Sequence, residues 1–418
     1  MIAPMRPSRL TPATTREETG PSASFFDRDV PAYVKRTYSP RSAWRDRPFG
    51  PRDEAFFVRG VEALSRLYTV DREAGHGSLP LPRDYLNNPR YRSAYLLYFM
   101  PMQAAKFSHL FRAYPRALDS ALAHAAAEGC LRVADLGCGP GTASAALLLS
   151  LAERRLAGLE HSPVPPIELT WYDTHAAILE DGQAIIGDLR RRLDAVGFSP
   201  DVSLTVRRQP WHRVLDAAPP GNWSLTLLGN VINETLPAGR APTEREQATW
   251  RKLIAQNGGG GVLTVGPAIK PVAQHLSRLR DVLVATGDGG GTLGHPLHGP
   301  CLHAGPCPLS AGRDWCHFSV QTDVPGALFG RLSSRLGSVR SWLKFCWIWF
   351  AAPTRPGTPH DPSERRVVSD PLDGTTGTVL LCEPGRPARY QRAGRLRLRR
   401  GDVIRLAPAP RAPGRRAR

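Results

Sequence analysis

Three cysteines in one short, turn-rich stretch are the residues of this sequence best suited to metal chemistry. Cys301, Cys307 and Cys316 are spaced Cys-x5-Cys-x8-Cys among glycines and prolines, and Cys382 follows at the end of a predicted strand. Thiolates presented by turns can bind zinc in a tetrahedral site or iron in an iron–sulfur cluster. Structural zinc sites more often use Cys-x-x-Cys, so the wide spacing favours a cluster. Because cysteine is often buried as a small apolar residue, a set of free buried thiols is the alternative.

The remaining cysteines and the nearby histidines are weaker candidates for metal ligands. Cys130, Cys138 and Cys346 lie in or beside predicted strands and are interpreted as core residues. The histidines that could replace a thiolate ligand are His295, His298, His303 and His317. Radical enzymes that use S-adenosylmethionine leave one iron open by providing three closely spaced cysteines. The spacing here is wider and a fourth cysteine is present, so radical chemistry is not predicted.

A glycine-rich loop after a buried strand is the second candidate site. The strand is predicted at 131–136, its end carries Asp135, and an amphipathic helix is predicted at 143–156. The glycines of the loop are Gly137, Gly139 and Gly141. They allow a tight turn and a close approach of the backbone to a ligand. Strand, glycine turn and helix open a doubly wound α/β domain, whose ligand lies beyond the carboxyl end of the first strand. A Rossmann-like domain that binds another nucleotide, or none, is the alternative.

Two further positions are expected at this ligand site. Asp173 closes a strand predicted at 167–172, where an acid can bind a ribose diol. Asn230 follows the predicted fourth strand and is a candidate cofactor contact, as are Asn233 and Glu234, although helix capping explains these polar residues equally well. The chain has neither the Asn/Asp-Pro-Pro-aromatic motif of N-directed methyltransferases nor a cysteine nucleophile near strands four and five. No catalytic residue can be named.

The elements that must position these residues form a mostly parallel sheet. Further strands are predicted at 202–207, 223–228 and 261–265, then at 342–350 and 377–381 after a long insertion. The predicted organisation is a flexible basic extension at 1–52, a helical region at 53–128, a Rossmann-like core at 129–268, a cysteine-rich insertion at 269–340, the last core strands at 341–385 and a basic tail at 386–418.

Composition restricts the classes of function. The chain has 418 residues, is 41% hydrophobic and carries a formal net charge of +18. A strongly basic globular protein is expected to bind a polyanion, and nucleic acid is the first candidate. No run of eighteen apolar residues or signal-peptide core occurs, so a cytoplasmic protein without a membrane partner is expected. The arginines expected to contact phosphates are Arg386, Arg389, Arg392, Arg395, Arg397, Arg399, Arg400 and Arg405.

The motifs together resemble a known family. Asp135 and the glycines after it resemble the first motif of class I S-adenosylmethionine-dependent methyltransferases. That motif, the segments GPC…GPCPL and DWCHF, and the terminal LLCEPGR resemble the methyltransferase-like proteins of the mitochondrial small ribosomal subunit and their bacterial relatives. The resemblance covers about 95–386. The second cysteine interval and the linker to Cys382 look longer than in the family.

The resemblance implies a class I methyltransferase fold, S-adenosylmethionine at the glycine loop and a [4Fe-4S] cluster on the four cysteines. It also implies that the partner is rRNA of the small ribosomal subunit, during ribosome assembly or translation. The expected compartment is a bacterial-type cytoplasm, in preference to a mitochondrial matrix. A monomer is expected. Two alternatives stay open: a non-catalytic rRNA-binding assembly factor, and a small-molecule methyltransferase with a structural zinc site.

Overall fold

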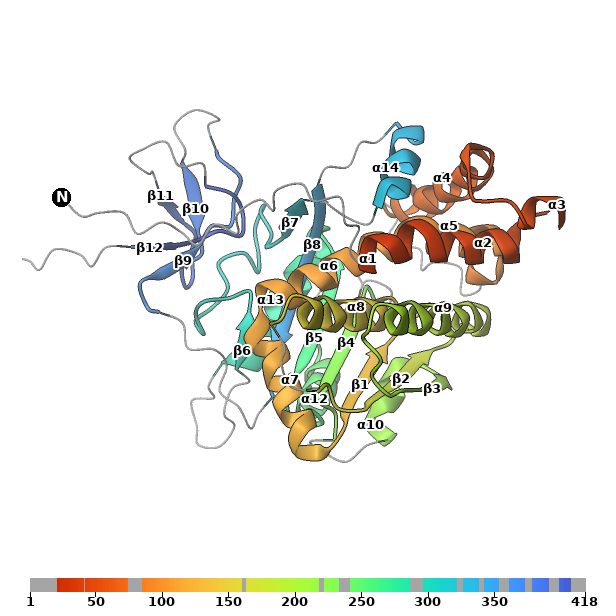
Figure 1. Cartoon of the computed structure of the whole chain (residues 1–418). Helices are drawn as coiled ribbons and strands as arrows, with labels where there is room; N and C mark the ends of the chain where they lie inside the picture. Colours follow the sequence, from red (N-terminus) through yellow and green to blue (C-terminus); the bar gives the residue numbers. More distant parts are fainter. Residues whose placement is uncertain are drawn as a thin grey trace, which may run out of the picture.

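A mixed β-sheet between two layers of helices organises the protein in the computed structural model (Figure 1). The structure describes residues 21–40, 42–73, 85–159, 163–217, 222–232, 241–285, 296–321, 326–337, 342–352, 361–372, 378–390 and 398–406. The strands of the main sheet follow the order β3-β2-β1-β4-β5-β8-β6, and β7 also pairs with β8.

The first five strands form the parallel part of the sheet. They are β1 (Leu131–Leu136), β2 (Ile167–Asp173), β3 (Val202–Arg208), β4 (Leu225–Gly229) and β5 (Val262–Pro267). Each pair of neighbours runs parallel. The predicted strands at these positions are confirmed, and Asp173 is the last residue of β2 as expected.

Helices cover both faces because alternate residues of each strand point to opposite sides. Leu131 and Val133 of β1 pack into the core beneath α6–α9, whereas Ala134 and Leu136 pack into the core beneath α10, α12 and α13. The covering helices after β1 are α8 (Thr142–Leu156), α9 (Ala176–Ala195), α10 (Val214–Ala217), α12 (Glu244–Ala255) and α13 (Lys270–Val284).

The antiparallel end of the sheet differs from the prediction. Strand β8 (Trp342–Phe350) lies between β5 and a broken edge strand made of β6 (Leu297–Gly299) and β7 (Phe318–Gln321). The short β6 was not predicted, because three residues among glycine, proline and histidine carry no strand pattern. The predicted strand at 377–381 does not close this sheet. Much of the predicted insertion, 269–340, therefore belongs to the sheet and its covering layer, and the loop 300–317 emerges between β6 and β7.

The N-terminal region forms a helical lobe above the sheet (Figure 1). Its elements are α1 (Pro21–Ser24), η1 (Phe25–Asp29), α2 (Val30–Tyr38), α3 (Ser42–Arg45), α4 (Pro51–Glu73), η2 (Tyr85–Asn87), α5 (Pro89–Ala94), η3 (Tyr95–Phe99), α6 (Met100–Ala113) and α7 (Pro115–Glu128). The prediction of a flexible extension at 1–52 is wrong for the described part from residue 21. Phe25, Val30 and Val34 bury their side chains there, so apolar burial outweighs the Pro- and Arg-rich composition.

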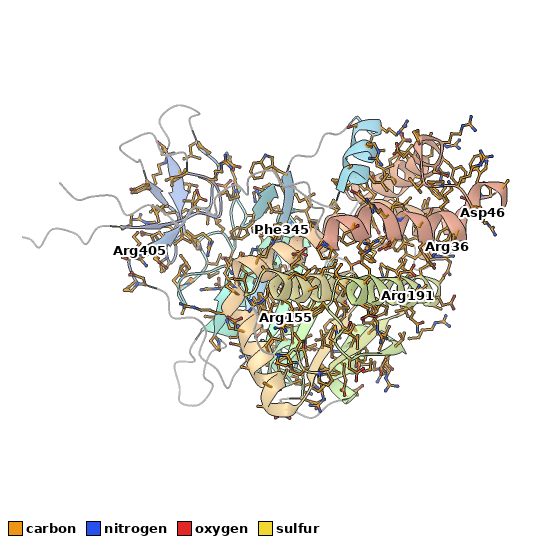
Figure 2. The ribbon with its side chains drawn as sticks, viewed as in Figure 1. Arg36, Asp46, Arg155, Arg191, Phe345 and Arg405 are labelled. Atoms are coloured by element: carbon orange, nitrogen blue, oxygen red, sulfur yellow. The ribbon has the colours of Figure 1, made fainter. Side chains whose placement is uncertain are left out.

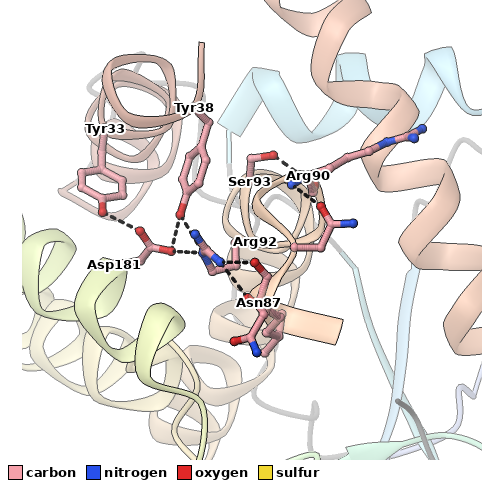
Figure 3. Close-up of polar contacts among 9 residues, drawn as sticks. Tyr33, Tyr38, Asn87, Arg90, Arg92, Ser93 and Asp181 are labelled. Atoms are coloured by element: carbon pink, nitrogen blue, oxygen red, sulfur yellow. Dashed lines mark hydrogen bonds and ion pairs between the residues drawn. The ribbon is translucent and has the colours of Figure 1, made fainter. Parts of the chain in front are cut away.

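Buried polar contacts attach this lobe to α9 (Figure 3). The Asp181 carboxylate accepts hydrogen bonds from Tyr33 Oη at 2.7 Å, from Tyr38 Oη, and from Arg92 Nε at 3.1 Å. Asp181 is only 5% exposed, so its charge is compensated by Arg92 and the two hydroxyls. Burial, followed by the hydrogen bond to Asp181, raises the pKa of both tyrosines, which keeps them as neutral donors.

The lobe is also joined to α14 (Gly326–Arg335), which lies in the connection between β7 and β8. Asp27 accepts hydrogen bonds from the backbone N–H groups of Ala327 and Leu328, at 2.9 and 3.0 Å, and so caps this helix. Glu54, which is 3% exposed, pairs with Arg331 at 2.6 Å and Arg335 at 3.2 Å. The N-terminal lobe is therefore attached to a helix about 300 residues later in the chain, by the contact of Asp27 with Ala327.

A small β-module follows the main sheet at the far end of the molecule from the helical lobe (Figure 2, Arg405 against Arg36). Strand β9 (Glu364–Arg366) pairs antiparallel with β12 (Val403–Arg405), and β10 (Val379–Leu381) pairs antiparallel with β11 (Ala388–Tyr390). A bridge between Val367 and Leu381 joins the two pairs. The predicted basic tail is thus partly folded, and 391–397 and 407–418 lie outside the described residues.

Candidate functional site

The glycine loop between β1 and α8 has the shape that the sequence predicted. Gly137, Gly139 and Gly141 have φ values of 63°, 53° and 73°, which favour glycine. A Cβ on Gly137 would lie 2.4 Å from Val231 Cγ2, and one on Gly141 would lie 2.0 Å from Trp171 Cζ2. A Cβ on Gly139 would meet only Tyr95 Oη, at 3.9 Å. Gly137 and Gly141 are therefore required by packing, whereas Gly139 borders open space.

Asp135 supports this loop from beneath. Its Oδ2 accepts hydrogen bonds from the Ser144 backbone N–H at 3.0 Å and from Ser144 Oγ at 2.7 Å, near the start of α8. Trp171 Nε1 donates in turn to Ser144 Oγ at 2.9 Å. Burial raises the pKa of Asp135 to about 6, although the bonds from Ser144 oppose the shift. Asp135 therefore fixes strand, loop and helix relative to one another.

Asp173 holds the loop from the side of β2. Its Oδ2 accepts a hydrogen bond from the Gly139 N–H at 2.9 Å, and its Oδ1 accepts one from the His175 N–H at 3.0 Å. The Nδ1 of His175 also lies 3.0 Å from Oδ1. Burial raises the pKa of Asp173, but the bonds from His175 and Gly139 outweigh it and leave the pKa below its ordinary value. A charged acceptor thus stands beside the open side of the loop.

A pocket lies against the loop at the carboxyl ends of β1 and β4. The loop and its surroundings contribute Asp135, Gly137, Cys138, Thr142 and Ala143, and the end of β4 contributes Gly229 and Asn230. Asn230 has a φ of 60°, in the left-handed region that asparagine tolerates better than most residues. Asn233 and Glu234 lie outside the described residues. Five of the six predicted cofactor residues thus lie in the loop or line the pocket: Asp135, Gly137, Gly139, Gly141 and Asn230. The sixth, Asp173, contacts the loop through its hydrogen bond from the Gly139 N–H.

The helical lobe covers this pocket with residues that the sequence did not single out as a site. Tyr95 of η3 and Gln103 and Phe107 of α6 complete its wall. Lys106, one turn along α6 from Gln103, is 3% exposed and donates a hydrogen bond to Gln103 Oε1 at 2.7 Å. In the sequence this helical stretch interleaves tyrosines with arginines and a lysine. That pattern does not show which of these side chains face the sheet.

The pocket fits the amino-acid and ribose ends of S-adenosylmethionine in the types of group it presents. Gly139 leaves a space that any Cβ would fill on the open side of the loop, whose own N–H groups are bonded to Tyr172, Cys138 and Asp173. Asp173 provides the carboxylate that ribose hydroxyls need, at the position after β2 where such ligands are bound. Asp135 and Asn230 would border the other end of the ligand. The described residues of the pocket include no group that stands out as a general base.

The cysteine loop forms a second cavity on the other side of the sheet. Cys301, Cys307 and Cys316 line it together with Arg280 and with Cys346 of β8. Cys382 belongs to the same cluster of side chains as Cys307 and Cys316, and His303 Nε2 lies 3.3 Å from its Sγ. The structure therefore brings the four predicted ligands into one neighbourhood. Across the described ranges, however, no three histidine, cysteine or carboxylate side chains are arranged to hold a metal ion.

Burial and the neighbouring thiols raise the pKa of three cysteines of this cluster, Cys307, Cys316 and Cys382. Burial, reinforced by the neighbouring thiols Cys307, Cys301 and Cys382, raises the pKa of Cys316 well above its ordinary value. Burial raises the pKa of Cys307 to about 11, and it also raises that of Cys382, where Cys301 and Cys307 add to the effect. Soft sulfur donors of this kind suit iron or zinc.

Side chains of α13 hold the cysteine loop in shape. The buried Arg280 guanidinium donates to the backbone carbonyls of His303 and Gly305 and pairs with Asp281 at 2.7 Å. Asp281 accepts the Cys307 N–H at 2.9 Å. Gln274 donates to the carbonyls of Gly312 and Asp314, and Arg278 to that of Ser310. The loop conformation is thus determined by the protein itself.

The other predicted cysteines and histidines are placed as follows. Cys130, Cys138 and Cys346 are buried as expected, although Cys138 borders the cofactor pocket and Cys346 the cysteine cavity. Burial lowers the pKa of His298 to about 4, so it is neutral beside Trp349. His317 contacts the Trp315 carbonyl at 3.1 Å, and His295 lies outside the described residues.

Comparisons with known proteins find methyltransferases among the similar solved structures, at low similarity. No protein-family model matches the chain, and no curated protein does. The chain is similar to a solved structure from Methanococcus maripaludis assigned as an S-adenosylmethionine-dependent methyltransferase, with 12% identity, a TM-score of 0.21, and coverage of 39% of this chain and 61% of that one. A class I protein of this kind from Listeria monocytogenes gives 9% identity, a TM-score of 0.31, and coverage of 81% and 90%.

A third similar structure is geranyl diphosphate C-methyltransferase from Streptomyces coelicolor, with 14% identity, a TM-score of 0.28, and coverage of 73% of this chain and all of that one. Similarity this low defines no function, and the fold assignment depends on the strand order and the glycine loop. Together these define a methyltransferase-like α/β fold. No helix within the described ranges is long and apolar enough to cross a membrane.

Proposed function

We propose that this protein binds S-adenosylmethionine at the glycine loop and acts on rRNA of the small ribosomal subunit during ribosome assembly or translation. The observation that supports cofactor binding most directly is the open side of Gly139 beside the Asp173 carboxylate. Bound S-adenosylmethionine would supply an activated methyl group. The chain itself would orient the ligand through the Asp173 carboxylate beside Gly139, and Tyr95, Gln103 and Phe107 would limit access of water.

We further propose that Cys301, Cys307, Cys316 and Cys382 bind a [4Fe-4S] cluster. The proposal is supported by the cavity that Cys301, Cys307 and Cys316 line and by the packing of Cys382 in the same cluster as Cys307. Arg280 and Asp281 hold the loop in this conformation. A closed site with four thiolates leaves no iron open, which favours a structural or iron-sensing role over catalysis. Zinc bound by the same residues is the alternative.

A non-catalytic rRNA-binding factor is the second candidate. It is favoured by one observation: among the described residues of the pocket the only carboxylate is that of Asp135, which is buried and bonded to Ser144, so none is placed as an evident base. Both candidates share the cofactor pocket and the RNA partner. They differ only in whether label from S-adenosylmethionine reaches RNA.

The deciding experiment combines three measurements on anaerobically purified protein. Iron, sulfide and zinc are quantified for the wild type and Cys307→Ser, binding of S-adenosylmethionine is measured by calorimetry, and transfer of labelled methyl groups to small-subunit rRNA is followed. About four irons per chain, lost in the variant, would support the cluster. One zinc and no affinity for RNA even at low salt would instead favour a small-molecule methyltransferase.

A further inference from the structure

An exposed aromatic side chain lies at the outer end of the main sheet. Trp342, the first residue of β8, is 40% exposed, which is unusual for tryptophan in this sheet because Trp347 and Trp349 are buried. Lys344 is exposed two residues further along the strand, so it shares the face of Trp342. Ser319 of β7 is paired with Lys344 and extends this face to the sheet edge.

The β-module contributes a cation to the same place. The guanidinium of Arg399 lies over the indole of Trp342, with its carbon 5.6 Å from the ring centroid. The turn that carries Arg399 is fixed, because the Arg399 N–H donates to Asp402 Oδ2 at 2.7 Å and the Asp402 N–H donates to the Arg399 carbonyl at 3.0 Å. Two elements far apart in the sequence, β8 and the β-module, thus meet in one cation–π contact.

The charges at this surface are available to a ligand. Among the residues that the structure describes, neither Lys344 nor Arg399 forms an ion pair, whereas Arg400 beside them is half-buried and lies 3.7 Å from Asp370. Arg399 covers one side of the Trp342 indole, and the exposed part of the ring and the outer plane of the guanidinium remain accessible. The chain as a whole carries +18 charges, so its surroundings favour an anionic partner.

We propose that Trp342, Lys344 and Arg399 form a stacking platform for single-stranded RNA. A nucleobase can stack on an indole or a guanidinium plane, and the adjacent lysine can contact the phosphate that follows the base. The three side chains are the combination that unpaired RNA requires and that a duplex, whose bases are stacked internally, cannot use. This proposal deepens the rRNA part of the proposed function and depends on it, and it identifies the bound form as an unpaired segment.

The test is the binding of a fluorescein-labelled uridine oligonucleotide of about twelve nucleotides, followed by anisotropy over a range of salt concentrations. Trp342→Ala is expected to weaken binding about tenfold, and Trp342→Phe, which keeps an aromatic face, to weaken it much less. Lys344→Gln is expected to make the slope of log K against log salt concentration shallower by about one unit, which corresponds to the loss of one phosphate contact. Arg213→Gln, an exposed arginine near α10 at the other end of the sheet, is the control for lost charge and should leave the salt slope unchanged.

The outcomes separate the platform from the proposed function. If the wild type binds the oligonucleotide and Trp342→Ala binds equally well, the platform is refuted and the rRNA role survives. If the wild type binds no RNA at low salt, both are refuted. If Trp342→Ala lowers binding of an RNA duplex or of polyglutamate as much as that of the uridine oligonucleotide, base stacking is refuted as the mode of recognition. Near-ultraviolet circular dichroism of each variant verifies that the fold is retained.

Discussion

Replacement of Gly139 by alanine tests the cofactor pocket with little disturbance of the fold. Gly139 has a φ of 53°, and the left-handed conformation costs a residue with a side chain about 1–2 kcal/mol. The added Cβ would meet nothing nearer than Tyr95 Oη at 3.9 Å, so no steric clash adds to this cost in the ligand-free protein. The new methyl group would, however, occupy the space on the open side of the loop, where the ligand is proposed to lie.

Gly158 provides a matched control. Its φ is 67° and an added Cβ would have no neighbour within 4 Å, so Gly158→Ala introduces the same backbone strain away from the pocket. Both variants should lose about 1–2 kcal/mol of unfolding free energy in chemical denaturation. Only Gly139→Ala should lose affinity for S-adenosylmethionine, by at least about tenfold in calorimetry, which corresponds to about 1.4 kcal/mol of binding free energy.

Two results would contradict this reasoning. If Gly139→Ala bound S-adenosylmethionine with wild-type affinity, the open side of the loop could not be where the ligand approaches. If Gly158→Ala lost affinity to the same extent, the loss would come from general destabilisation and not from steric exclusion at the loop.

Three further predictions concern buried charges. The pKa of Asp135 is raised from 3.8 to about 6 in the folded protein, so the native state binds the proton more tightly, and the associated stability is present at acid pH and lost as the pH rises through 6. Between pH 4 and 7 the unfolding free energy of the cofactor-free wild type should therefore fall, relative to that of Asp135→Asn, by up to about 3 kcal/mol. If the difference between the two unfolding free energies did not change with pH, the prediction would be wrong. Asp181→Asn leaves Arg92 without its carboxylate, so we expect a loss of about 3 kcal/mol and faster proteolysis of the helical lobe, with Tyr33→Phe costing about 1 kcal/mol. Arg280→Met removes the hydrogen bonds to the carbonyls of His303 and Gly305 and should lower the metal content several-fold. Arg278→Met, which removes the hydrogen bond to the Ser310 carbonyl, should retain the metal. If both variants retained the same metal content, the role of Arg280 would be refuted.

Local patterns in the sequence predicted the centre of the molecule well. The loop after Asp135 and the acid at 173 follow from residues close together in the chain, since an apolar run, three glycines and an amphipathic helix specify one another. The five parallel strands were predictable for the same reason.

The antiparallel edge and the covering of the pocket were not predictable in this way. The three-residue strand β6 is a strand only because β8 pairs with it, and that pairing joins residues about fifty positions apart. Tyr95, Gln103 and Phe107 lie in a helical stretch whose amphipathic pattern indicates a buried face but not which partner it buries against. Long-range pairing, and not local propensity, decides these parts of the site.

The attachment of α14 to the N-terminal lobe has a consequence for the order of folding. Asp27 caps a helix that lies 300 residues later in the chain, and Glu54 pairs with Arg331 and Arg335 of that helix. During synthesis the first helices therefore emerge long before the partner that completes their packing. Contacts of such large sequence separation slow folding, and Phe25 and Val34 belong to a surface that stays incomplete until the last third of the chain has been made. The lobe at the start of the chain is thus expected to be among the last parts to become stable, and pulse-labelled hydrogen exchange during refolding should show its amides protected after those of β1 and β4.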